Sequence, residues 1–204
     1  HLNDKKPHDI SVRVFNPTVS KQGWKSTHTI VEIVVPDSPF LVDSIKMALT
    51  RLDLASHMML HGPTQIQRDK KQDIVSINNG EGDLLSLFHV EVDRLSEKEA
   101  MTSLKNEIFT ILTDAQLVVA DWKPMVDKLK LVTDQVERQQ GKIEIERDHY
   151  EETIKFLRWL GDHNFTFMGY KEYDLINENG EMELKPTAEK GLGLFSNPKH
   201  VRRV

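Results

Sequence analysis

One stretch of the sequence decides the fold: Thr29-Ile-Val-Glu-Ile-Val-Val-Pro-Asp-Ser-Pro-Phe-Leu-Val-Asp-Ser44. Its first part, residues 29–35, is rich in β-branched side chains, which predicts a strand buried on at least one face. Residues 36–39 then break the strand, and we expect Ser38 to cap a helix that begins at Pro39. That helix has one apolar face, formed by Leu41, Ile45, Leu49 and Leu52.

The rest of the chain extends this unit into an antiparallel sheet. Further strands are predicted at 10–15, 54–60, 74–77, 85–92 and 117–120, and a second amphipathic helix at 96–112. Gly62-Pro63 closes the strand at 54–60, with residues 64–68 as an optional continuation. From Thr29 the order is βαββαβ with an optional extra hairpin in the middle, which accounts for the strand at 74–77. This order predicts an α+β, ferredoxin-like sheet with both helices on one face.

The last third of the chain predicts helices and then a hairpin. Helices are expected at 124–136 and 148–161, and a hairpin at 165–184 that turns at Asn179-Gly180. An isolated hairpin is marginally stable, so this one needs a partner. We therefore divide the chain into a leading strand and connector (1–25), a ferredoxin-like domain (26–123), a helical connector (124–163) and the truncated start of a following domain (164–204).

Composition excludes several classes of protein. The 204 residues are 38% hydrophobic and 29% charged, a soluble globular balance, and the net charge of −5 gives no basic field for nucleic acid or anionic membrane. Zero cysteines exclude disulfides and thiolate sites and are compatible with a cytoplasmic location. No apolar run reaches the roughly 20 residues of a membrane span. The polar first residues contain no signal peptide, and the missing initial Met suggests a piece of a longer chain.

No catalytic motif is present, and two readings of the histidines compete. The sequence lacks a dinucleotide-binding glycine motif, a Walker motif and a His-Glu-x-x-His motif, so we expect no catalytic residue and no bound cofactor. His57 and His61 on one strand and His89 on another suggest a metal site. Histidines on a half-exposed sheet are more often solvated or hydrogen-bonded, so we predict no metal.

The turn at 37–41 is the candidate binding site. A helix start presents free backbone N–H groups and a positive dipole end, which suit an anion or a carboxylate. Asp37 and Asp43 flank this start, and the simpler reading is that both complement the dipole. The alternative is an effector site at Asp37, Ser38, Phe40 and Leu41, in which Asp37 receives an ammonium group.

Four blocks of sequence resemble the N-terminal region of the large bacterial NAD-specific glutamate dehydrogenases. They are Arg13-Val-Phe-Asn-Pro17, Gly23-Trp-Lys-Ser-Thr-His-Thr-Ile-Val-Glu32, Asp37-Ser-Pro-Phe-Leu-Val-Asp-Ser44 and Phe156-Leu-Arg-Trp-Leu-Gly-Asp-His-Asn-Phe-Thr-Phe-Met-Gly-Tyr-Lys-Glu-Tyr173. The resemblance implies ACT-like modules in a long, cytoplasmic, homo-oligomeric polypeptide that oxidises L-glutamate with NAD. It places the NAD-binding catalytic region outside this chain, which is then a non-catalytic regulatory or assembly segment. The alternative is an amino-acid-sensing ACT module.

One departure separates these two functions. Many amino-acid-binding ACT modules have a glycine in the turn before the first helix, where this chain has Phe40, whose side chain can block a ligand. We therefore rank assembly above sensing. We expect the uncovered sheet face, with apolar residues among Met58, Met59, Phe88 and Val90, to pack on another copy or on a neighbouring ACT-like module.

Overall fold

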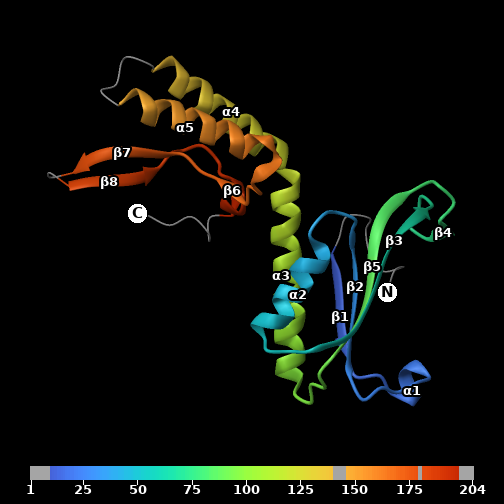
Figure 1. Cartoon of the computed structure of the whole chain (residues 1–204). Helices are drawn as coiled ribbons and strands as arrows, with labels where there is room; N and C mark the ends of the chain where they lie inside the picture. Colours follow the sequence, from blue (N-terminus) through green and yellow to red (C-terminus); the bar gives the residue numbers. More distant parts are fainter. Residues whose placement is uncertain (1–9, 140–145, 179–180, 198–204) are drawn as a thin grey trace. The chain divides into compact units, whose positions relative to one another are not determined.

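The computed structural model describes residues 10–139, 146–178 and 181–197 (Figure 1). It divides into two compact units, residues 1–115 and 116–204, and we describe each unit by itself. The helix α3 (Lys98–Ala120) begins in the first unit and ends in the second. Among the described residues, no helix combines the length and apolarity that crossing a bilayer requires.

The first unit is an α+β unit with a five-stranded antiparallel sheet, which confirms the predicted class. The spatial order of the strands is β1-β2-β5-β3-β4, and helices α2 and α3 cover one face (Figure 1). Before α3, its elements are β1 (Ser11–Phe15), α1 (Val19–Gln22), β2 (Thr29–Pro36), α2 (Leu41–Arg51), β3 (Ser56–Arg68), β4 (Ile74–Ile77) and β5 (Asp83–Val92).

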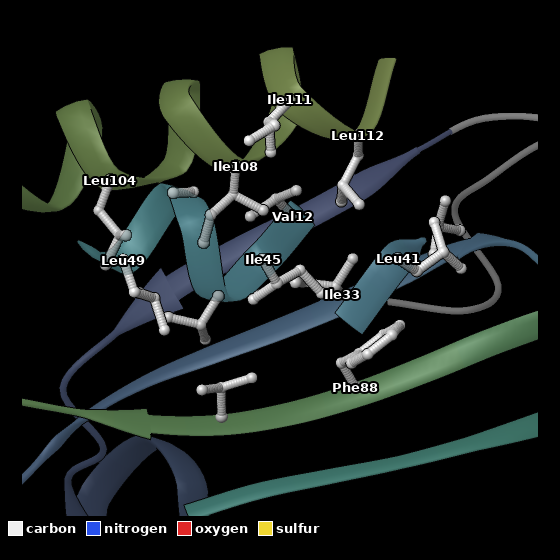
Figure 2. Close-up of a cluster of buried hydrophobic side chains, with 14 of the residues drawn as sticks. Val12, Ile33, Leu41, Ile45, Leu49, Phe88, Leu104, Ile108, Ile111 and Leu112 are labelled. Carbon is white, nitrogen blue, oxygen red and sulfur yellow. The ribbon is translucent and has the colours of Figure 1, made fainter. Parts of the chain in front are cut away.

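Strand alternation sends one set of side chains to the helices and the other to the face away from them, which we call the open face. Val31 and Ile33 of β2 lie beside Val90 and Phe88 of β5, and all four are buried under the helices. Ile45 of α2 packs against them, and Figure 2 shows the cluster these side chains form. The helices contribute further buried residues, which are Leu41, Ala48, Leu49, Leu104, Ile108, Ile111 and Leu112. This core holds the turn between β2 and α2 in place.

The predicted final strand at 117–120 is wrong, because these residues continue α3. Leu117, Val118 and Val119 favour a strand locally, but no glycine or proline interrupts the helix before them. The place beside β2 is taken instead by β1, whose Val12 lies opposite Ile33. The leading segment thus supplies an edge strand of the sheet.

Strand β3 is longer than predicted, because it continues through Gly62-Pro63 instead of closing there. The Gln65 N–H and carbonyl both bond to Asn78, on the side away from β5. Pro63, two residues earlier, points its backbone the same way, toward an edge that β4 does not reach. Its missing N–H therefore removes no hydrogen bond from the ladder with β5.

The second unit joins two amphipathic helices to short strands. After α3 it contains α4 (Trp122–Arg138), α5 (Arg147–Trp159), the π-helical turn η2 (Leu160–Asn164), β6 (Gly169–Tyr170), β7 (Tyr173–Glu178), β8 (Glu181–Pro186), β9 (Leu192–Gly193) and the 3₁₀ turn η3 (Leu194–Ser196). Both predicted helices are confirmed, although the second begins at Arg147 and ends in η2. The predicted strand at 165–175 is reduced to β6 and the start of β7, and the predicted Asn179-Gly180 turn lies outside the described residues.

Candidate effector site

The turn between β2 and α2 is longer than predicted. The helix begins at Leu41, two residues after Pro39, and its N-cap is Phe40, which makes no side-chain capping bond. Ser38 therefore does not cap the helix. Its Oγ is buried and has no hydrogen-bond partner among the described residues. A buried hydroxyl without a partner has lost its bonds to water, which is unfavourable. Because the Ser38 Oγ is not exposed, a polar ligand group can reach it only if the turn moves, and would then supply the hydrogen bond that it lacks.

Asp37 is exposed but is held against β5 by two hydrogen bonds. Its N–H donates to the Leu84 carbonyl over 3.0 Å, and its Oδ1 accepts from Ser86 Oγ over 2.5 Å. Ser86 Oγ also lies 3.2 Å from His61 Nε2. Because the single hydroxyl proton of Ser86 goes to Asp37, the His61 ring donates in this contact. Asp37, Ser86 and His61 thus form one chain of hydrogen bonds that links the turn after β2 to β5 and β3.

Phe40 occupies a backbone conformation that glycine usually fills. Its φ is 70°, in the left-handed region, and its side chain is 51% exposed. A residue with a Cβ is strained there by about 1–2 kcal/mol. The backbone of the turn therefore has the conformation that a glycine usually adopts, and the phenyl ring of Phe40 is exposed beside it.

The four predicted site residues are not equally available. Asp37 and Phe40 are exposed, and Ser38 is half-buried. Leu41 is only 3% exposed and belongs to the core in Figure 2, so its side chain cannot touch a ligand. A carboxylate, a buried hydroxyl and the first amides of α2 remain, a set that can receive an ammonium and a carboxylate group.

The histidines named as possible metal ligands separate in space. His61 faces the helices and stacks on Phe88, with ring centroids 4.3 Å apart, whereas His89 faces the open side. His57 lies at a β-bulge, which breaks the alternation that would have aligned it with His61. Across the described part of the chain, no group of three or more histidine, aspartate or glutamate residues could hold a metal ion.

His57 instead belongs to a polar cluster at the end of the sheet. Its Nε2 lies 2.7 Å from Asp93, its ring stacks on His28 at 4.3 Å, and His28 Nδ1 lies 2.8 Å from Glu91. The pKa of Asp93 lies below its usual value because the Ala55 amide, and then the His57 ring, hydrogen-bond to the carboxylate. These contacts fix the connector before β2 onto the sheet.

A second ionic cluster lies in the second unit. Lys128 of α4 donates to Glu172 over 2.8 Å and to Glu189 over 2.9 Å, and the Tyr170 hydroxyl donates to Glu172 over 2.9 Å. Hydrogen bonds from Lys128 first, and from Tyr170 second, lower the pKa of Glu172. Glu172 and then Glu189 raise the pKa of Lys128. The cluster ties α4 to the segments around β6 and β8.

Sequence reasoning did not identify Ser86 of β5 as the hydrogen-bond partner of Asp37 in the turn. A signal was present, because Ser86 shares the inward phase of Phe88, Val90 and Val92 and is the polar member of that series. A buried polar residue in an apolar series requires a hydrogen-bond partner. That partner, Asp37, lies too far away in sequence for the pattern to identify it.

Comparison of the sequence with known proteins shows the family to which the chain belongs. The sequence matches the family described as "Glutamate dehydrogenase, ACT1 domain" over residues 1–108. The NAD-specific glutamate dehydrogenase of Pseudomonas aeruginosa is 33% identical over 172 residues, 82% of this chain and 10% of that protein. The enzyme of the same name from Halomonas elongata is 30% identical over 205 residues, 97% of this chain and 13% of that protein. The chain thus spans about a tenth of the length of these curated relatives.

Proposed function

Because the chain belongs to the NAD-specific glutamate dehydrogenase family, we propose that it is a non-catalytic regulatory and assembly segment of such an enzyme. In this proposal the parent is a cytoplasmic enzyme that oxidises L-glutamate with NAD and water to 2-oxoglutarate, ammonia and NADH. The observation that carries the proposal is the ACT1 match over residues 1–108, which coincides with the first compact unit, residues 1–115.

The strand pairing of this chain supports a site for the chemistry elsewhere in the parent. Dinucleotides commonly bind beyond the carboxyl ends of a parallel sheet, at the N-terminus of a helix. Every strand pair in the described residues is antiparallel. We therefore assign NAD to the parent and no cofactor to this chain.

The strand order supports an ACT-type, ferredoxin-like identity for the first unit. Such a sheet requires two helices on one face and an edge strand antiparallel to the strand that precedes the first helix. Here β1 supplies that edge strand from the beginning of the chain. We infer a ferredoxin-like arrangement in space whose fourth strand comes first in the sequence.

An activity measurement tests the proposal that the catalytic site lies outside this chain. The isolated 204-residue chain, supplied with L-glutamate and NAD, is expected to form no NADH, while the parent protein does so under the same conditions. Turnover by the isolated chain would overturn the non-catalytic assignment.

Amino-acid sensing at the 37–41 turn is a second candidate, favoured by the buried Ser38 Oγ and the adjacent Asp37 carboxylate. Calorimetry with a panel of amino acids on the parent tests it, together with Asp37→Ala and the matched control Asp43→Ala in the first turn of α2. Selective loss of binding in Asp37→Ala supports sensing. No binding by the parent, or equal effects of the two substitutions, rejects it.

Assembly is the role we rank first, with another copy or a neighbouring ACT-like module as the partner. About half of Met58, Met59, Phe88 and Val90 were expected on the uncovered face, and only Met58 lies there, because the other three face the helices. The open face nevertheless carries other apolar side chains, including Leu60 and Leu87.

The second unit also leaves apolar side chains without cover. Leu175, Met182 and Leu184 share one face of the β7–β8 hairpin and are all exposed. A two-stranded hairpin is marginal alone, so we propose that residues 164–204 begin a further domain whose remainder covers this face.

A further inference from the structure

The open face of the first unit contains a shallow, open hollow of about 680 Å³, and Gly62 is one of the residues that line it. Val34 of β2, Leu87 of β5, Leu60 of β3 and Ile74 of β4 also line it. The side chains of Leu60, Val34 and Leu87 have the strand phase that points away from α2 and α3. We call this feature the Gly62 hollow.

Neither the backbone nor the packing requires a glycine at position 62. Gly62 lies within β3 opposite Leu87, its φ is outside the left-handed region, and a Cβ built on it meets no atom within 4 Å. Glycine inside a strand destabilises it by roughly 0.5–1 kcal/mol relative to alanine. A glycine inside a strand often marks a bulge, a bend or a place where another molecule approaches closely, and the pairing of β3 with β5 has no bulge at Gly62.

A projecting side chain lies beside the hollow on the same strand. Leu60 has the same strand phase as Gly62 and is 59% exposed. At about 3.3 Å per residue, the two positions lie roughly 7 Å apart on the open face. Strand β3 therefore carries the exposed side chain of Leu60 next to the apolar hollow at Gly62.

We propose that this face pairs with the same face of a second copy, with Leu60 of each copy in the Gly62 hollow of the other. In a two-fold interface each contact occurs twice, and a projection next to a hollow on the same strand is one arrangement that makes a face complementary to itself. The inference rests on the assembly role proposed above and names its surface and its partner.

The charges at the rim of the hollow are compatible with a second copy. Glu32 at the rim is paired with Arg13 over 2.6 Å, so two identical rims do not bring unpaired carboxylates together. His89 lies opposite Glu32 on β5 and is within 3.8 Å of Glu91. The Arg13–Glu32 ion pair thus reduces the like-charge repulsion that normally opposes a face packing on itself.

The area predicts a weak pair in isolation. A face five strands wide, with strands about 4.8 Å apart and about six residues long, spans roughly 20 by 20 Å, so two copies bury at most roughly 800 Å². Part of this face is already covered, because Ile66 and Leu85 are buried there and the Trp24 ring lies 6.4 Å from His89. Interfaces of that size are transient alone and become effective when other contacts of an oligomer raise the local concentration. We expect association of the chain between about 10 μM and 1 mM.

Cross-linking tests the contact directly, because the chain contains no cysteine. Packed sheets lie about 10 Å apart, too far for a disulfide, so the reagent is a thiol cross-linker with a spacer of about that length. We mix a Leu60→Cys chain with a Gly62→Cys chain and expect a cross-linked dimer. Met47→Cys replaces Leu60→Cys in the control mixture, because Met47 is 46% exposed on α2, which covers the other face.

Analytical ultracentrifugation of the 204-residue chain provides the second readout. Leu60→Asp removes both projections and Gly62→Leu fills both holes, and each is expected to weaken association about a hundredfold or more. Met47→Asp is expected to associate like the unchanged chain. Circular dichroism verifies folding, which Gly62→Leu is expected to retain because its Cβ enters open space.

Three results would each overturn the inference. They are a chain that stays monomeric up to about 1 mM, cross-linking no greater than in the Met47→Cys control, and unchanged association in both Leu60→Asp and Gly62→Leu. None of them bears on the non-catalytic assignment, which fails only if the isolated chain turns over L-glutamate.

Discussion

Replacing Phe40 with glycine and, separately, with alanine measures the strain in the turn before α2. Both substitutions remove the same phenyl ring, which is 51% exposed, so both lose about 1 kcal/mol of burial. Alanine keeps a Cβ at φ 70°, which costs about 1–2 kcal/mol, whereas glycine has no such penalty. Glycine loses roughly 0.5–1 kcal/mol more chain entropy on folding.

The balance predicts that Phe40→Gly is more stable than Phe40→Ala by about 1 kcal/mol. For a unit of this size the difference corresponds to roughly 5 °C in midpoint temperature. Urea unfolding of both variants, monitored by circular dichroism, measures it. Phe109 is the matched control, because it is 47% exposed in the middle of α3.

At Phe109 the order of the two variants is reversed. In a helix interior glycine is about 1 kcal/mol less favourable than alanine, so Phe109→Gly is expected to be the weaker variant. If Phe40→Ala equals or exceeds Phe40→Gly while Phe109 shows its normal order, Phe40 does not occupy the left-handed region in solution and the reasoning is refuted.

Two further substitutions and one titration test the packing and the ionic cluster. Ile108→Ala is expected to lower the free energy of unfolding by about 2–5 kcal/mol and Met47→Ala by much less, measured by urea denaturation. Lys128→Met is expected to speed amide exchange around β6 and β8, whereas Lys130→Met, which loses only a contact to its own helix, leaves it unchanged. Because folding lowers the pKa of Glu172, its contribution is present above the unfolded value of 4.5 and is lost as the pH falls below that value, where the same exchange experiment is expected to show loosening. Unchanged protection at acidic pH would remove the role assigned to this cluster.

The sequence predicted the elements with strong periodicity and failed where distant residues decide. The alternation of β5, which sets Phe88 and Val90 on the opposite face from Leu87 and His89, was readable because period two is a property of the strand itself. Which of the two faces the helices cover was not readable, and the structure shows that Phe88 and Val90 face them. Residues 117–120 look like a strand and are helical, because local preference did not reveal that β1 already occupies the edge beside β2.

The candidate site divides along the same line. The sequence predicted Asp37 in the turn, because residues 36–39 break the strand. It also showed directly that Phe40 stands where many amino-acid-binding ACT modules have a glycine. The link through Ser86 to His61 was not predictable, because it requires the register that pairs β3 with β5. The Gly62 hollow was not predictable for a similar reason. The sequence alone does not show whether a glycine lies in a turn or, as here, in a strand with open space beside it.

The position of β1 also determines how the sheet is assembled during folding. Phe15 pairs with Ile30, a short distance along the chain, whereas a strand after α3 could reach the same edge only by closing a loop that contains almost the whole unit. Closing the shorter loop costs roughly 1.5 kcal/mol less entropy. The edge beside β2 can therefore be covered before either long helix has docked, which shortens the time for which the most apolar strand of the sheet is exposed to other unfolded chains.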